Sequence, residues 1–373
     1  MTLLDTRALN RATLDRQLLL RRAGLSVPQA LERLVGLQAQ TPQTWYVGLW
    51  SRLADYTAEP TARLLADGGV VRMALMRSTI HLVTAADCLW LRPLVEPVIE
   101  RSTMGAFGRH LIGLTRADLV AAARESLVDK PLTFSDLGRA LARWWPERDP
   151  AALAQAARAW VPLVQVPPRG LWGRSGRAAH SPVETWLGRP VEPDPSVDAL
   201  VLRYLAAFGP ATVRDVQQWC GLTRLSEVVD RLRPRLVAFR DEQGRELFDL
   251  PDAPRPDPET PAPVRFLYDF DNLLLSHADR SRVVSVDYAG QGFGATMEQP
   301  RSVLVDGFVA ATWRVAVNRD TATLTVRPFR RLTAAEQEQL DAEGARLLAF
   351  LAPEAPVHDV VTRPGNAAAP TAA

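Results

Sequence analysis

The clearest structural pattern in this chain is ALVLRYLAAFGPATVRDVQQWCGLTRLSEVVDRLRPRLVAFRDEQGRELFDL, residues 199–250. Its apolar spacing and its turn residues predict a helix over Ala199–Phe208, a turn at Gly209-Pro210, a short helix from Thr212 to Gly221, a helix over Leu225–Leu232 and a hairpin over Leu236–Leu250. Helices followed by a β-ribbon are typical of a winged helix-turn-helix. However, residues 191–252 hold 8 arginines against 11 acidic residues. A domain that binds duplex DNA usually carries excess positive charge, so we favour a structural role for this unit.

The same order of elements is predicted twice upstream. Helices are expected at 10–23, from a capping box at Ser26–Gln29 onward, and at Gln43–Leu53, before a β-rich Val70–Val83. Helices at 115–127, 135–145 and 150–160 then precede an extended Val161–Leu171. We therefore predict an α+β fold with tandem winged helix-turn-helix units at 1–110, 111–190 and 191–252, a linker at 253–264, a β-rich subdomain with a closing helix at 265–352, and a tail at 353–373.

Composition limits the class of protein. The 373 residues are 47% hydrophobic, which indicates a folded globular protein. No apolar run is long enough to span a membrane, and the N-terminus does not look like a signal peptide. Two cysteines give no disulfide framework and favour a cytoplasmic location.

The charge is unevenly distributed. Residues 1–190 hold 24 Lys+Arg against 16 Asp+Glu, a net charge of +8, whereas residues 191–373 hold 20 against 26, a net charge of −6. This asymmetry favours a polyanionic partner on the N-terminal half. Chance is the alternative explanation.

The tripeptide Gln38-Ala39-Gln40 stands directly before Thr41-Pro42. Because Pro42 disfavours a helical Thr41, we expect the preceding amphipathic helix to end close to Gln40. In extended or helix-ending backbone, side chains two residues apart can share one face. Two amides on one face can position a water and place carbonyl oxygens beside a developing cation. The alternative is that both amides merely cap the helix end.

Other catalytic patterns are weak. The five histidines lack metal-ligand spacing, and Gly290–Gly294 does not open a helix, so we expect a loop there. The segment Tyr268–Arg282 is richer in ionisable side chains, with three carboxylates and His277. His277 near an aspartate could act as acid or base. The alternative is a turn network in which Arg280 and Arg282 clamp a phosphate.

Four segments together resemble the winged-helix DNA glycosylases of the AlkZ type, which unhook interstrand crosslinks. The strongest match is Gly36-Leu37-Gln38-Ala39-Gln40-Thr41-Pro42, which is similar to the Gln-hydrophobic-Gln motif of that family. A sister group carries Asp at the position of Gln40, and Ala39 is small for the hydrophobic position. The other matches are Arg77-Ser78-Thr79-Ile80-His81-Leu82, Arg169-Gly170-Leu171-Trp172-Gly173 and Asp271-Asn272-Leu273-Leu274-Leu275-Ser276-His277.

The resemblance implies tandem winged helices around a DNA-binding concavity and removal of alkylated purines, typically N7-substituted guanine. Some family members protect producers of DNA-alkylating antibiotics. Gln38 and Gln40 would jointly position water and stabilise a cationic sugar, without metal or cofactor. The partner would be double-stranded DNA with alkylated or crosslinked bases. The DNA-contact candidates are Arg77, Arg169, Arg174, His277, Arg280 and Arg282.

Lysine is almost absent. Lys130 is the one lysine in the chain, which suits a hydrolytic enzyme rather than one that also cuts the strand through a Schiff base. A bulky crosslinked base argues for an open cleft rather than a tight flipping pocket. We expect a monomer. A non-catalytic winged-helix regulator remains the alternative function.

Overall fold

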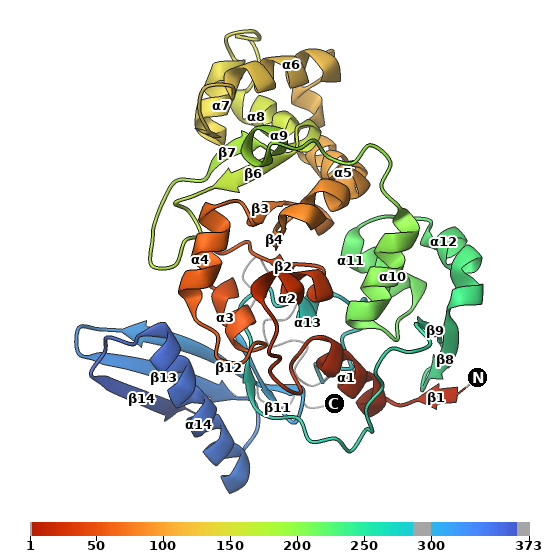
Figure 1. The fold of residues 1–373 in the computed structure, drawn as a ribbon, viewed down its shortest axis with the longest axis vertical. Coiled ribbons are helices and arrows are strands. Elements are labelled where there is room, and N and C mark those ends of the chain that lie inside the picture. The colour runs from red at the N-terminus through yellow and green to blue at the C-terminus, as the bar shows by residue number, and fades with distance from the viewer. Residues whose placement is uncertain (1, 286–299, 364–373) are drawn as a thin grey trace, which may run out of the picture.

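The computed structural model describes residues 2–285 and 300–363. The chain forms the predicted mixed α+β fold, drawn out along one axis (Figure 1). The predicted loop at Gly290–Gly294 and the end of the tail at Gly365–Ala373 lie outside the described residues. Within those residues, no helix combines the length and apolarity needed to cross a membrane.

The segment 191–252 contains the predicted elements almost residue for residue. They are α10 (Val197–Phe208), α11 (Val213–Cys220), α12 (Leu225–Leu232), the 3-10 turn η3 (Arg233–Arg235), β8 (Val237–Asp241) and β9 (Glu246–Asp249). A Thr212–Asp215 capping box starts α11, and left-handed Gly221 ends it. The sequence did not predict β1 (Thr2–Leu4), which pairs parallel with β8 and completes the sheet β1-β8-β9.

The N-terminal segment departs from the prediction where its helices end. Its elements are α1 (Thr6–Arg16), α2 (Val27–Leu34), β2 (Leu37–Gln38), α3 (Trp45–Trp50), α4 (Ala58–Ala66), β3 (Val70–Ala74), η1 (Met76–Ser78), β4 (Ile80–Thr84), α5 (Ala85–Phe107) and η2 (Gly108–His110). The capping box of Ser26 and Gln29 is confirmed. The expectation that the next helix reaches Gln40 is wrong, because Val35 and Gly36 are left-handed and the chain turns into β2.

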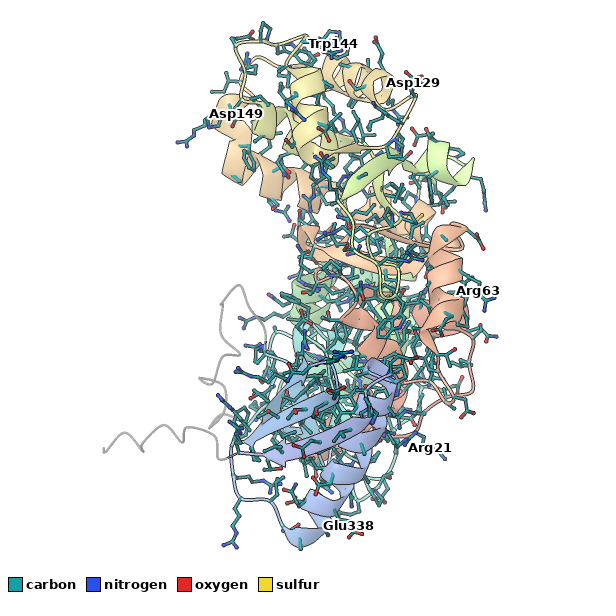
Figure 2. The ribbon with its side chains drawn as sticks, turned by 90° about the vertical axis from the view of Figure 1, so that its left-hand side faces the viewer. Arg21, Arg63, Asp129, Trp144, Asp149 and Glu338 are labelled. Atoms are coloured by element: carbon teal, nitrogen blue, oxygen red, sulfur yellow. The ribbon has the colours of Figure 1, made fainter. Side chains whose placement is uncertain are left out.

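Residues 111–190 add α6 (Arg116–Ser126), β5 (Leu132–Thr133), α7 (Phe134–Leu141), α8 (Pro150–Trp160), β6 (Leu163–Val166), β7 (Ala179–Pro182) and α9 (Val183–Leu187). Their strands join those of the first segment in one sheet, ordered β2-β4-β3-β6-β7-β5. Helices α6–α8 form the upper end of the molecule (Figure 1). Asp129 and Trp144 lie at this end in Figure 2, and Glu338 lies at the other.

The C-terminal part is β-rich, as predicted. It consists of β10 (Arg265–Phe266), α13 (Asn272–Leu275), β11 (Ser302–Val305), β12 (Phe308–Val317), β13 (Thr321–Pro328), α14 (Ala334–Leu351) and β14 (Val357–Thr362). The turn at Asp306-Gly307 joins β11 to β12, and both residues are left-handed. The assignment of all residues after 352 to a tail is wrong, because β14 pairs parallel with β13 and closes a five-stranded sheet.

Buried arginines fasten these parts together. Arg16 of α1 makes a bidentate ion pair with Asp249 of β9, at 2.7 and 2.8 Å, and both side chains are fully buried. Arg16 and Arg11 also donate to carbonyls of the 253–264 linker, at Pro254 and Thr260. The linker therefore packs along α1 and is not a free tether. Removing one partner of such a buried pair typically costs about 3–5 kcal/mol.

Candidate active site

The Gln-x-Gln motif lies at the edge of the six-stranded sheet. Leu37 and Gln38 form β2, which pairs antiparallel with β4, and Ala39 continues this pairing by donating to the carbonyl of Ile80 at 2.7 Å. Gly36 allows this approach. Its φ is +82°, and a Cβ there would stand 2.8 Å from the carbonyl oxygen of Leu82. The motif therefore begins as a strand, which ends at Gln38, and Gln40 follows just beyond it.

Gln38 is a buried side chain with a charged donor. It is 3% exposed, and its Oε1 accepts from Nη2 of Arg77 at 2.6 Å. The other terminal nitrogen of Arg77 donates to the carbonyl of Trp219 at 2.7 Å. Burial lowers the pKa of Arg77 to about 10, so the guanidinium stays charged at neutral pH. The structure thus places a cation against the first glutamine.

Gln40 differs because its side chain is exposed. Its Oε1 accepts from the backbone N–H of Ile80 at 3.1 Å, which fixes the orientation of the amide. An amide oxygen has two lone pairs, so one remains available. Among the described residues no group accepts from Nε2 of Gln40. This amide is therefore fixed by the sheet and open to solvent.

The Asp271-Asn272 segment supports the motif from behind. Oδ1 of Asn272 accepts from the N–H of Gln38 at 3.3 Å, and its Nδ2 donates to the carbonyl of Gly36 at 2.7 Å. Tyr268 donates its hydroxyl to the carbonyl of Gln38 at 2.8 Å. Asp271 caps α13 and pairs with fully buried Arg52. Two segments more than 200 residues apart therefore form one rigid unit.

A carboxylate also reaches the motif. Asp269 accepts a hydrogen bond from the hydroxyl of Thr41, and its Oδ1 lies 3.8 Å from Nε of Arg301. Oδ1 itself has no hydrogen-bond partner among the described residues, although Asp269 is only 9% exposed. A mostly buried carboxylate is thus hydrogen bonded to Thr41, the residue that follows the exposed Gln40.

The Arg169–Gly173 segment is held against the motif from the other side. Gln43 accepts from the N–H of Gly173 at 3.2 Å and donates to the carbonyl of Arg174 at 2.7 Å. Tyr46 donates to the carbonyl of Gly170 at 3.1 Å. Gly170 has a φ of +93°, and a Cβ there would stand 2.9 Å from Nη1 of Arg72. Arg72 in turn donates to the carbonyl of Ala39 at 2.7 Å.

His81 is a buried residue of the matching segment Arg77–Leu82. It lies opposite Gln38 in the β2–β4 pairing, and its Nδ1 is 3.0 Å from the carbonyl of Thr79. Because a carbonyl only accepts, Nδ1 carries the proton. Burial and the charge of Arg77 lower the pKa of His81 to about 3, so the ring is neutral at working pH.

The predicted DNA contacts fall into two groups. His277 and Arg282 are buried, and they bond to the carbonyls of Phe208 and Pro210. Neither position is open to nucleic acid in this structure, and the lowered pKa of His277, caused first by burial, leaves the ring neutral. Both terminal nitrogens of Arg77 already donate hydrogen bonds within the protein, to Gln38 and to the carbonyl of Trp219.

The remaining candidates are more accessible. Arg174 is exposed and forms no ion pair within the described residues. Arg169 is half-buried and donates to the carbonyl of Gly176, and Arg280 is also half-buried. Residues that the sequence did not single out for the site are Gln43, Tyr268, Asp269 and Asn272. Tyr268, Asp269 and Asn272 belong to the charged segment Tyr268–Arg282, part of which also resembles the family. Nothing in the local sequence indicated which of these side chains would contact the motif.

The described residues contain no group of three or more His, Cys, Asp or Glu side chains placed to hold a metal ion. The polar groups gathered at the motif are amides, hydroxyls, a carboxylate, a neutral histidine and arginines. Residues 31–350 match the model of the family described as DNA glycosylase AlkZ-like. The chain belongs to the AlkZ-like DNA glycosylase family.

Two comparisons agree with this family. The interstrand DNA cross-link repair glycosylase of Streptomyces sahachiroi is 25% identical over 363 residues, covering 90% of this chain and 93% of the relative. The solved structure of the Streptomyces sahachiroi DNA glycosylase AlkZ superposes with a TM-score of 0.79 at 20% identity, covering 97% of this chain and all of the other. The AlkZ-like match includes all four segments that meet at the site, whereas β1, α1 and β14 lie outside it.

Proposed function

We propose that this AlkZ-like glycosylase is monofunctional and hydrolyses the N-glycosidic bond of N7-alkylated purines in duplex DNA, interstrand crosslinks included. The observation that carries the proposal is the exposed, sheet-fixed amide of Gln40, followed directly by Thr41, whose hydroxyl donates to the carboxylate of Asp269. The crosslink substrate is suggested by the Streptomyces sahachiroi relative, an interstrand DNA cross-link repair glycosylase. A role in DNA repair or in self-resistance to an alkylating antibiotic follows from the same substrate.

The chemistry suits the groups present. Alkylation at N7 makes the purine cationic and a good leaving group, so little acid catalysis is needed. Bond cleavage builds positive charge on the sugar, as in glycoside hydrolysis generally. What the site must supply is a positioned water and negative potential at the cation. Gln40 offers a free lone pair and an N–H, and Asp269 offers the charge.

The two glutamines divide the work. We assign water positioning to Gln40, because its side chain is exposed. Gln38 is buried and hydrogen bonded to Arg77, so it acts as a positioning residue that holds the edge strand and the local field. The remaining lone pair and the dipole of the Gln38 amide therefore act on the sugar only from this buried, hydrogen-bonded position.

DNA would lie across tandem winged helices, with exposed arginines such as Arg174 on phosphates. Lys130 supports the monofunctional assignment. It follows Asp129, which Figure 2 places on the upper lobe, far from the central β2 of Figure 1. No lysine amine is therefore near the motif to form a Schiff base.

The test is release of N7-methylguanine from a duplex, measured in single turnover with a metal chelator present. Gln40→Ala should lower the rate by about a hundredfold or more, corresponding to about 2.7 kcal/mol of transition-state stabilisation. Gln38→Ala should slow release less. Both variants should keep their affinity for the duplex, because the proposal places arginines, and neither glutamine, on the phosphates.

Gln339→Ala is the matched control, since this exposed glutamine lies on α14, away from the motif. It should release base at the wild-type rate. If Gln40→Ala also does so, the catalytic assignment is wrong. If the wild type binds one DNA sequence tightly and releases no base, the protein is a regulator.

A further inference from the structure

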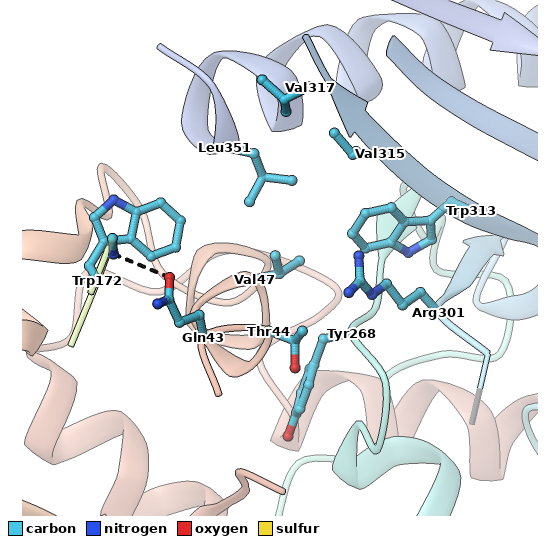
Figure 3. A pocket seen from close by; sticks show the side chains of 11 residues that line it. Gln43, Thr44, Val47, Trp172, Tyr268, Arg301, Trp313, Val315, Val317 and Leu351 are labelled. Atoms are coloured by element: carbon cyan, nitrogen blue, oxygen red, sulfur yellow. Dashed lines mark hydrogen bonds between the residues drawn. The ribbon is translucent and has the colours of Figure 1, made fainter. Parts of the chain in front are cut away.

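A cavity of about 360 Å³ opens beside the motif. It lies between α3, the turn at Trp172-Gly173, strand β12 and the end of α14 (Figure 3). Trp172 and Trp313 stand on opposite sides, with Val47, Val315 and Leu351 between them. Its polar groups, Gln43, Thr44, Tyr268 and Arg301, gather on the side nearer α3 and Tyr268.

We propose that this cavity receives a planar, apolar substituent carried by the alkylated base. The inference rests on the proposed function and names the class of adduct that the site prefers. Two indole walls suit an aromatic guest, because offset and edge contacts between rings are favourable. An apolar cavity of about 150 Å³ is enough to bind benzene, so this one has room for one or two rings.

Residues that line the cavity also hold the catalytic motif in place. Tyr268 lines it with its ring and donates its hydroxyl to the carbonyl of Gln38. Arg301, also in its lining, faces Asp269, which holds Thr41 next to Gln40. A base whose sugar lies at Gln40 can therefore place an N7 substituent toward this opening.

The walls are already in place. Trp172 packs on Tyr46 and Phe350, with ring centroids 4.9 and 5.1 Å apart. Nε1 of Trp313 donates to the carbonyl of Leu267 at 2.8 Å, and Arg301 lies 5.2 Å from its ring centroid. A preformed cavity loses little conformational entropy when a guest enters. The cavity near Arg265 and Glu343 lacks aromatic walls, and its lining includes charged residues of both signs.

Filling the cavity tests the proposal. Val315→Trp adds a large side chain from a half-buried strand position. Single-turnover kcat/KM should fall about tenfold or more for a duplex with N7-benzylguanine, while N7-methylguanine changes less than about twofold. Val357→Trp, exposed on strand β14 of the same sheet, is the control and should leave both substrates unchanged.

If Val315→Trp slows both adducts equally, or neither, the cavity does not hold the substituent and the proposal is overturned, while the glycosylase function stands. If the wild type releases neither base, both proposals fail. A second measurement does not depend on the filled variant. Inactive Gln40→Ala should bind the N7-benzylguanine duplex about tenfold more tightly than the N7-methylguanine duplex, and equal affinities would contradict the proposal.

Discussion

Arg77 donates to the buried amide oxygen of Gln38 at 2.6 Å and, through its second terminal nitrogen, to the carbonyl of Trp219 at 2.7 Å. One guanidinium thus joins the catalytic strand to the end of α11, where Trp219 stands 142 residues after Arg77. Planar geometry with several donors makes this possible, and a lysine ammonium would not reproduce it. The resemblance assigned this arginine to DNA contact, whereas its hydrogen bonds place it within the protein.

Arg77→Met should therefore lower the free energy of unfolding by about 2–3 kcal/mol, because two acceptors in the protein interior lose a charged donor. Base release should slow as well, since Gln38 is no longer held. Urea unfolding and single-turnover release measure the two effects. Arg101→Met is the control, because exposed Arg101 donates only to the carbonyl of Gly221. Equal stability of the two variants would contradict this interpretation.

Asn272→Leu should loosen the motif from behind. The change leaves the N–H of Gln38 and the carbonyl of Gly36 without partners, at a cost of about 1–3 kcal/mol each. Thermal unfolding should occur at lower temperature, and base release should fall about tenfold. Asn318→Leu, in the exposed turn between β12 and β13, should change neither. A normal release rate in Asn272→Leu would show that this clamp does not position the motif.

Asp269→Asn removes a negative charge while keeping the shape of the side chain. We expect kcat to fall about tenfold with little change in KM, because the charge acts on the cationic sugar and not on duplex binding. Asp359→Asn, exposed on β14, serves as control. A loss confined to KM would instead place Asp269 in substrate binding.

Arg174→Gln should weaken duplex binding without changing the release rate at saturating enzyme. Each lost phosphate contact lowers the slope of log affinity against log salt by about 0.9. Arg224→Gln is the control, since exposed Arg224 already pairs with Glu227. An unchanged salt slope in Arg174→Gln would remove this residue from the DNA interface.

Stability should fall as the solution becomes acidic. Burial lowers the pKa of His180 to about 4, and its ring stacks on Phe134 at 3.9 Å. Since an unfolded histidine titrates near pH 6.5, the unfolded state binds the extra proton between about pH 6.5 and 4. The stabilisation is complete above that window and is lost as pH falls through it. Near pH 5 this histidine alone lowers the free energy of unfolding by about 2 kcal/mol relative to neutral pH.

His180→Phe should therefore lose less stability than the wild type between about pH 7 and pH 5, measured by urea unfolding. Phe134→Leu removes the stacking partner without removing a titratable group, so its effect should be similar at both pH values. Parallel pH profiles for wild type and His180→Phe would refute the assignment.

Several elements could be read directly from the sequence because the interactions that start and stop them are local. The capping boxes at Ser26 and Thr212 and the left-handed Gly221 act within one helical turn. The closing helix Ala334–Leu351 begins at a third capping box and matches the prediction. The sequence also indicated the α+β class and the glycosylase family, since the motif segments are contiguous in the chain.

The tertiary structure decided what the amides do. Local pattern extended the second helix toward Gln40, but pairing with Ile80 and Leu82 and the left-handed Gly36 made the motif an edge strand. The burial of Gln38 and the exposure of Gln40 follow from that strand. So do the contacts of Asn272 and Arg77, whose partners lie 234 and 39 residues away. Such partners are chosen by burial of the whole core and satisfaction of its polar groups, and no short window of sequence contains that information.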